Sequence, residues 1–123
     1  MRLWHESLIS YLPRQQLLGQ HREAASLRGL AWGKKHRTVD YVFTHFPGRL
    51  FAYHKLVMAE MKRRGYNINP VWESPEYRGN RCEPYDSVEQ IDLGNRPVYS
   101  EHDKNYLQEC IENLRGKGVE IRL

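Results

Sequence analysis

Apolar residues recur with helical spacing in three stretches of the chain, and the first stretch extends from Tyr11 to Gly29. Pro13 suits the first turn of a helix, and Gly29 can end or kink one. Because helix-compatible residues continue to His36, we predict one long helix, straight or kinked, that continues past Gly29. The residues that share its inner face are Leu17, His21, Ala24 and Arg28, with Leu18, Ala25 and Leu27 beside them.

The second and third stretches each end at a glycine, which is typical of a helix C-terminus. We predict one helix from Arg49 to Arg64, before Gly65, and another from His102 to Leu114, before Gly116. Their apolar positions are Leu50, Tyr53, Leu56, Val57, Met58, Ala59 and Met61 in the second stretch, and Tyr106, Leu107, Cys110, Ile111 and Leu114 in the third.

The segments between these helices contain turn-forming residues. Residues 39–46 are rich in β-branched and aromatic types, but Pro47 and Gly48 cut the run short, so we expect a loop or a short helical turn there. Residues 67–97 hold four of the six prolines, which indicates a long ordered loop. We expect Trp72, Tyr77 and Tyr85 to fix this loop to the helices.

The length of 123 residues suits a single hydrophobic core. We therefore predict an all-α fold in which residues 1–123 form a single compact domain of three main helices with long ordered loops. No apolar run reaches transmembrane length, and two cysteines without a Cys-x-x-Cys motif favour a reducing, cytoplasmic location. The 19 Lys and Arg against 15 Asp and Glu give a net charge of +4, which suits a polyanionic partner.

Candidate chemistry lies near the N-terminus, where Gln20-His21-Arg22-Glu23 follows the short arm Met1-Arg2-Leu3. An α-amine can form a Schiff base with a sugar aldehyde, and its ordinary pKa of about 8 leaves a neutral fraction at neutral pH. A carboxylate and a guanidinium within reach of that amine would suit it as a nucleophile. From these residues alone, however, the favoured interpretation of Glu23 is a solvated helical carboxylate paired with Arg22 or a neighbouring turn.

Several short motifs occur in an order and spacing that resemble one enzyme family. They are Met1-Arg2-Leu3, Gln15-x-Leu17-Leu18-x-x-x-Arg22-Glu23, Lys34-Lys35-His36, Ala59-Glu60-x-x-x-Arg64-Gly65-Tyr66-Asn67-Ile68 and Glu76-Tyr77-Arg78-Gly79. No motif is specific alone, but together they cover about the first two thirds of the chain. They resemble the pyrimidine-dimer DNA glycosylase family, the small phage-type endonuclease V enzymes.

The resemblance implies an enzyme that kinks double-stranded DNA, extrudes a base and attacks C1′ of a damaged nucleotide with its N-terminal α-amine. In that family the amine belongs to a small residue exposed by loss of the initiator Met. Here the bulk of Arg2 is expected to block that loss, so the resemblance assigns the amine of Met1. It assigns the catalytic carboxylate to Glu23, and phosphate binding with suppression of amine protonation to Arg22. It implies no cofactor and a monomer.

DNA contacts are predicted for basic residues and histidines around this site. Such residues at helix ends also suit the helix dipole, and His5 is equally a capping surface histidine. The histidines show neither an i, i+4 pair nor cysteine partners, so no metal site is expected. The predicted DNA-binding residues are Arg2, His5, His21, Lys34, Lys35, His36, Arg37, Arg64 and Arg78.

The resemblance weakens in the last third of the chain, where only the Arg96-Pro97 step and Tyr99 are similar to the family's aromatic and basic C-terminus. The lesion therefore stays open among a pyrimidine dimer, an oxidised or alkylated base, and an abasic site. Two other hypotheses also stay open. One is a DNA-binding module that keeps the fold without chemistry, and the other is a basic globular protein with no nucleic-acid role.

Overall fold

The computed structural model describes residues 2–29, 39–89, 91 and 97–123, and within these ranges all regular structure is helical. The predicted all-α class with three main helices is therefore confirmed. In chain order the elements are the 3-10 helix η1 (Glu6–Tyr11), α1 (Arg14–Arg28), the 3-10 helix η3 (Asp40–Thr44), α2 (Pro47–Arg63), the 3-10 helix η4 (Pro70–Glu73) and α3 (Lys104–Gly116).

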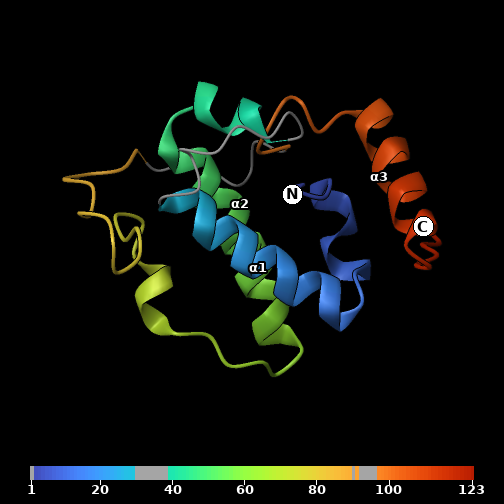
Figure 1. The fold of residues 1–123 in the computed structure, drawn as a ribbon, viewed down its shortest axis with the longest axis horizontal. Coiled ribbons are helices and arrows are strands. Elements are labelled where there is room, and N and C mark those ends of the chain that lie inside the picture. Colours follow the sequence, from blue (N-terminus) through green and yellow to red (C-terminus); the bar gives the residue numbers. More distant parts are fainter. Residues whose placement is uncertain (1, 30–38, 90, 92–96) are drawn as a thin grey trace.

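Helices α1 and α2 cross and pack against each other, and α3 lies to one side of the pair (Figure 1). The N-terminal arm lies between this pair and α3. The Tyr106 hydroxyl of α3 donates to the Leu3 carbonyl oxygen at 2.5 Å, and Gln20 of α1 and Tyr53 of α2 contact Trp4. Leu17 of α1, Tyr53 of α2 and Leu114 of α3 are all fully buried in one apolar cluster. The arm is thus enclosed by the core and is not a free tail.

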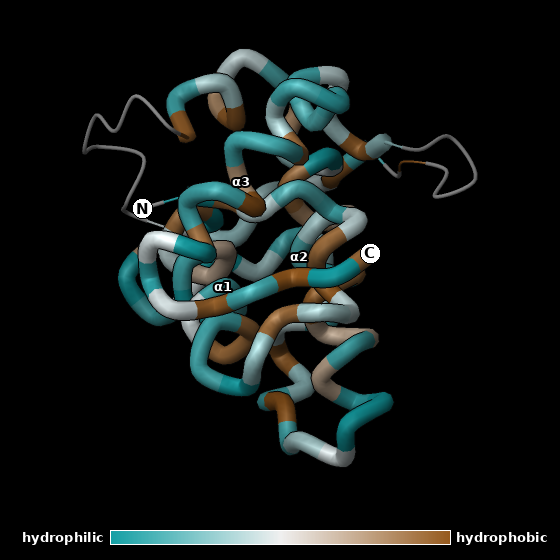
Figure 2. Tube along the Cα trace, turned by 90° about the vertical axis from the view of Figure 1, so that its right-hand side faces the viewer, coloured by the Kyte–Doolittle hydropathy of each residue, from teal (hydrophilic) through white to brown (hydrophobic). Residues whose placement is uncertain are grey.

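Apolar and polar residues alternate along the helical tube in Figure 2, as expected when each helix turns one face to a shared core. On α1 the buried residues include Gln20 besides the predicted Leu17, Ala24, Leu27 and Arg28. None of the helices in the described ranges is long and apolar enough to cross a membrane.

Helix α1 ends at Arg28, so the prediction of a helix that continues past Gly29 is wrong at Gly29 itself. The backbone of the later loop approaches this position closely. A Cβ atom on Gly29 would lie 2.6 Å from the carbonyl oxygen of Arg78, so only glycine fits here. The remainder of the predicted continuation, residues 30–36, lies outside the described residues.

The other two main helices differ from their predicted bounds by a few residues. Helix α2 starts at Pro47, which suits a first turn, and Gly65 follows its end with a φ of 82°. Helix α3 starts after Asp103, whose side chain accepts a hydrogen bond from the Tyr106 amide at 2.8 Å. It includes Gly116, the predicted stop, and Gly118 takes the left-handed conformation instead, with a φ of 85°.

The connecting segments follow the predictions more closely. Residues 40–44 form the short helix η3, and η4 interrupts an otherwise non-helical loop. Trp72 fixes this loop to α2, with its ring centroid 5.8 Å from that of His54, and Tyr77 packs on Trp72 at 4.8 Å. Tyr85 instead packs under the guanidinium of Arg78 within the same loop.

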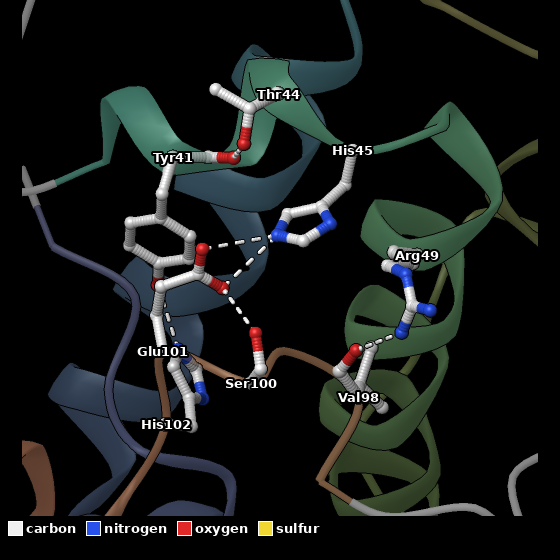
Figure 3. Close-up of polar contacts among 8 residues, drawn as sticks. All are labelled: Tyr41, Thr44, His45, Arg49, Val98, Ser100, Glu101 and His102. Atoms are coloured by element: carbon white, nitrogen blue, oxygen red, sulfur yellow. Dashed lines mark hydrogen bonds and ion pairs between the residues drawn. The ribbon is translucent and has the colours of Figure 1, made fainter.

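Residues 97–103, which precede α3, dock on η3 and on the start of α2 (Figure 3). Glu6 of η1 also accepts a hydrogen bond from the Val98 amide at 2.8 Å. This docking segment therefore joins the C-terminal helix to the rest of the fold. The bonds drawn in Figure 3 include Arg49 to the Val98 carbonyl (2.6 Å), His45 to Glu101 (3.0 Å) and Tyr41 to His102 (2.7 Å).

Candidate active site

The N-terminal arm is bound to α1 by a buried glutamine. Gln20 is 2% exposed; its Oε1 accepts from the Trp4 amide at 2.6 Å, and its Nε2 donates to the Arg2 carbonyl at 2.9 Å. The Tyr53 hydroxyl lies 2.7 Å from Gln20 Oε1 and 2.6 Å from the Trp4 carbonyl oxygen. Because these groups satisfy one another away from water, the arm has a defined path along α1.

Glu23 lies one helical turn further along the same face of α1. Its Oε2 accepts a hydrogen bond from the Arg2 amide nitrogen at 3.1 Å. Only the Cα and carbonyl carbon of Met1 separate that nitrogen from the α-amine of Met1, although Met1 itself lies outside the described residues. The Glu23 carboxylate is therefore bound to the peptide group that joins Met1 to Arg2.

A hollow of about 540 Å³ opens beside this contact, and we call it the arm hollow. The predicted site residues Arg2, Arg22 and Glu23 all line it. Gln20, Asn113 of α3 and Lys117, which follows α3, also line it, and none of these three was predicted as a site residue. The residues concerned are Arg2, Gln20, Arg22, Glu23, Asn113 and Lys117.

Helix α3 reaches the arm hollow through contacts with the arm. The Arg2 guanidinium donates to Glu109 at 3.1 Å, and it lies 5.6 Å from the Tyr106 ring. The side chain of Arg2, which was predicted to bind DNA, is thus already paired with a carboxylate. Asn113 of α3 and Lys117, the residue after α3, follow Glu109 by about one and two turns, and both line the arm hollow with Glu23.

A second hollow of about 550 Å³, the loop hollow, lies between α1 and the loop that contains Arg78. It brings together three predicted residues, His21, Arg22 and Arg78. The Arg78 Nε donates to the carbonyl of Arg28 at 3.1 Å, which holds this part of the loop at the end of α1. Trp72, Arg81 and Cys82 also line this hollow. Arg22 lines both hollows, so its exposed side chain lies between them.

Two predicted DNA-binding residues lie elsewhere. His5 is 7% exposed, caps η1 by accepting from the Ser7 amide at 3.1 Å, and stacks on His102 with ring centroids 5.5 Å apart. Arg64 donates to Glu60 at 2.6 Å and to the Ser10 carbonyl at 3.2 Å. The structure therefore gives His5 the capping alternative, in the core instead of at the surface, and places Arg64 in an ion pair. Neither lines the two hollows.

The predicted basic run Lys34, Lys35, His36 and Arg37 lies outside the described residues. Its contact with DNA stays a prediction. The position of Gly29 is nevertheless informative, because this glycine lines the loop hollow and the run begins five residues later.

A model of one protein family, described as pyrimidine dimer DNA glycosylase, matches residues 1–74. The match covers more than half of the chain and includes the arm, α1 and α2, and hence Gln20, Arg22 and Glu23. It ends before Arg78 and before α3. No curated protein and no solved structure matches the chain. The chain therefore belongs to the pyrimidine dimer DNA glycosylase family and is a DNA repair glycosylase whose substrate is DNA.

Proposed function

We propose that this protein is a bifunctional DNA glycosylase and abasic-site lyase that acts on damaged pyrimidines, pyrimidine dimers by resemblance, through the α-amine of Met1. The observation that carries this proposal is the hydrogen bond from the Arg2 amide to Glu23 Oε2 at 3.1 Å. It fixes a carboxylate next to the residue that bears the amine, beside a hollow that a sugar can enter.

In the proposed reaction the lone pair of the neutral amine attacks C1′ of the damaged nucleotide. The glycosidic bond breaks, and the base leaves with its electron pair and takes up a proton. Opening of the sugar ring then gives an iminium between the amine and C1′. Loss of a C2′ proton expels the 3′ phosphate by β-elimination, which nicks the strand, and water hydrolyses the remaining imine.

Glu23 and Arg22 have complementary roles in this scheme. The Glu23 carboxylate stabilises the developing positive charge at C1′ and on the iminium, and it carries protons during ring opening and elimination. Arg22 is exposed between the two hollows, which suits a contact to the phosphate beside the lesion. Its positive charge also disfavours protonation of a nearby amine.

The proposed partner is double-stranded DNA with a damaged base, bound by a monomer. His21 and Arg78 line the loop hollow together with Arg22, so these three residues form one continuous patch for phosphates. Contacts of Lys34, Lys35, His36 and Arg37 with DNA are also part of this proposal, although these residues lie outside the described ranges. Extrusion of a base from the duplex would give the amine access to C1′, which the stacked duplex buries.

A strand-nicking assay tests the proposal. It uses a panel of duplexes that each carry a single lesion, with a chelator present to remove metal ions. The protein with a free N-terminus is expected to nick at least one lesion, and the same protein with residues added before Met1 is expected to bind that duplex without nicking it. Binding without nicking by both forms would favour the non-catalytic DNA-binding module. Absence of salt-sensitive DNA affinity would instead favour a protein with no nucleic-acid role.

A further inference from the structure

Arg28 is a buried cation whose hydrogen bonds are fixed by the long loop. It is 5% exposed. Its terminal nitrogens donate to the carbonyl oxygens of Trp72 (2.8 Å), Ser74 (2.6 Å) and Tyr77 (2.9 Å). The remaining contact, at 3.0 Å, is to Nδ1 of His54. Burial lowers the pKa of Arg28 to about 10, so the guanidinium is charged at neutral pH.

This cation determines which ring nitrogen of His54 carries the proton. A guanidinium only donates, so Nδ1 of His54 must accept and carries no proton. His54 is therefore neutral, and its single ring proton is on Nε2. That Nε2 lies 2.8 Å from Nδ1 of His21, so the hydrogen bond runs from His54 to His21.

The direction of this hydrogen bond also determines where His21 carries its proton. Its Nδ1 accepts from His54, so its own ring proton is on Nε2. Protonation of His21 would place two N–H groups face to face, and His54 cannot turn its acceptor toward His21 while Arg28 holds it. Burial lowers the pKa of His21, and the charges of Arg22 and Arg28 lower it further. Burial, with Arg28 and His21, also lowers the pKa of His54 well below its ordinary value.

We infer that Arg28 and His54 form a proton-ordered chain that keeps His21 a neutral hydrogen-bond donor, with Nε2–H available to an oxygen of the DNA in the loop hollow. His21 lines this hollow, and its Nε2 has no partner among residues 2–29, 39–89, 91 and 97–123. The cations that face it are Arg22 from α1 and Arg78 and Arg81 from the loop, and Cys82 also lines the hollow.

The contact between His21 and DNA rests on the proposed function, whereas the order of protons along Arg28, His54 and His21 does not. The neighbouring arginines supply charge, which attracts any phosphate. A neutral N–H has a fixed direction and fixes the position of one acceptor. Because the chain disfavours protonation of His21, the contact is expected to add little pH dependence to DNA affinity near neutral pH.

Imidazole NMR spectra of the free, full-length protein test the proposed positions of the ring protons. We expect both His21 and His54 in the Nε2–H tautomer, each with a pKa below the ordinary value of histidine. Titration of His21 near its ordinary pKa of about 6.5, or a proton on its Nδ1, would overturn the chain. This result does not depend on whether the protein is a glycosylase.

Two variants of His54 test the link. His54→Gln can accept from Arg28 with its amide oxygen and donate to His21 with its amide nitrogen, so His21 is expected to stay neutral. His54→Phe removes both bonds, so the pKa of His21 is expected to rise and DNA affinity to increase below about pH 6.5. An unchanged titration of His21 in a folded His54→Phe variant would contradict the link. Equal titration of His21 in both variants would contradict it as well.

Variants of His21 test its contact with DNA, on the lesion-bearing duplexes used for the nicking assay. His21→Phe is expected to weaken DNA binding by about tenfold, and His21→Gln, which keeps a neutral donor, by less than about threefold. Equal losses in both variants would refute a directional donor. If the wild-type protein binds no DNA, the proposed function fails, while the tautomers measured by NMR still decide the chain.

Discussion

The N-terminal arm and the docking segment at residues 97–103 are two non-helical stretches that attach to the fold by different means. The arm contacts α1 and α2, and the docking segment contacts η3 and the start of α2. The arm is bound by the neutral amide of Gln20 and the hydroxyl of Tyr53, which contact its backbone. The docking segment instead includes contacts between side chains that involve histidines, namely His45 with Glu101 and Tyr41 with His102. The family match includes the arm and ends before the docking segment.

This difference suggests why each region is built as it is. An amine nucleophile works in its neutral form, near its ordinary pKa of about 8, so its position is best fixed by groups that do not titrate there. The docking segment has no such constraint. Burial, together with the nearby His5, lowers the pKa of His102 to about 3. Acid is therefore expected to loosen the docking segment before it loosens the arm.

The largest expected effect is on catalysis by the arm. Glu23→Gln should lower glycosylase turnover by about 10²- to 10⁴-fold while DNA binding persists, because its amide oxygen can still accept from the Arg2 amide. Single-turnover assays and binding measurements on the same duplex separate the two. Glu109→Gln is the matched control, since it removes an exposed carboxylate that also pairs with Arg2. Equal turnover in Glu23→Gln and the wild type would remove Glu23 from the mechanism.

The next effect is on the attachment of the arm. Gln20→Ala leaves the Trp4 amide and the Arg2 carbonyl without their buried partner, so the free energy of unfolding should fall by about 2–4 kcal/mol. Urea denaturation measures this loss. Gln15→Ala makes the same change at an exposed position on α1 and should stay within about 0.5 kcal/mol of the wild type. If both variants unfold alike, Gln20 does not hold the arm.

The docking segment should show a pH effect on stability. The folded-state pKa of His102 lies below the unfolded value of about 6.5, so the unfolded chain binds more protons and stability is lost as pH falls below about 6.5. One such histidine contributes a slope of at most about 1.4 kcal/mol per pH unit. His102→Gln should therefore flatten the dependence of unfolding free energy on pH between 6 and 4. A slope identical to that of the wild type would show that His102 is not buried in its neutral form.

The smallest expected effect concerns Lys117, which follows α3 and lines the arm hollow. Lys117→Ala should weaken DNA binding by a few fold, because one proposed phosphate contact is lost. The slope of log affinity against log salt concentration should become shallower by about one. Lys104→Ala removes a lysine at the other end of α3, which lines neither hollow, and serves as the control. Equal salt dependence in both variants would leave Lys117 without a role in binding.

The helices were predictable because their signals are local. The spacing of Leu17 and Ala24, or of Tyr53 and Val57, identifies an inner face from neighbouring residues alone, and Gly65 follows the end of α2 as expected. Arg22 and Glu23 were predicted as site residues through the resemblance to the family, and both line the arm hollow, while their roles stay a prediction. The end of α1 was missed because its cause is remote. The carbonyl of Arg78 occupies the space that a side chain at position 29 would need.

The contacts that assemble the site are between residues far apart in the chain, so local spacing does not show them. In the sequence Gln20 is one polar position in a charged turn, whereas in the structure it binds the backbone amide of Trp4, sixteen residues earlier. Arg28 was assigned to the inner face, but its carbonyl partners lie more than forty residues later. Asn113 and Lys117 lie in the part of the chain where the resemblance fails, and only the packing of α3 beside the arm brings them to Glu23.

Trapping with borohydride on a duplex with an abasic site tests the central claim most directly, because reduction converts the imine to a stable covalent adduct. The protein with a free N-terminus is expected to give an adduct whose cross-linked peptide carries the DNA on the α-amine of Met1. Extra residues before Met1 should abolish that adduct, whereas Lys117→Ala should still form it. An adduct of equal yield with the extended protein, or a cross-link on a lysine side chain, would contradict the proposed nucleophile.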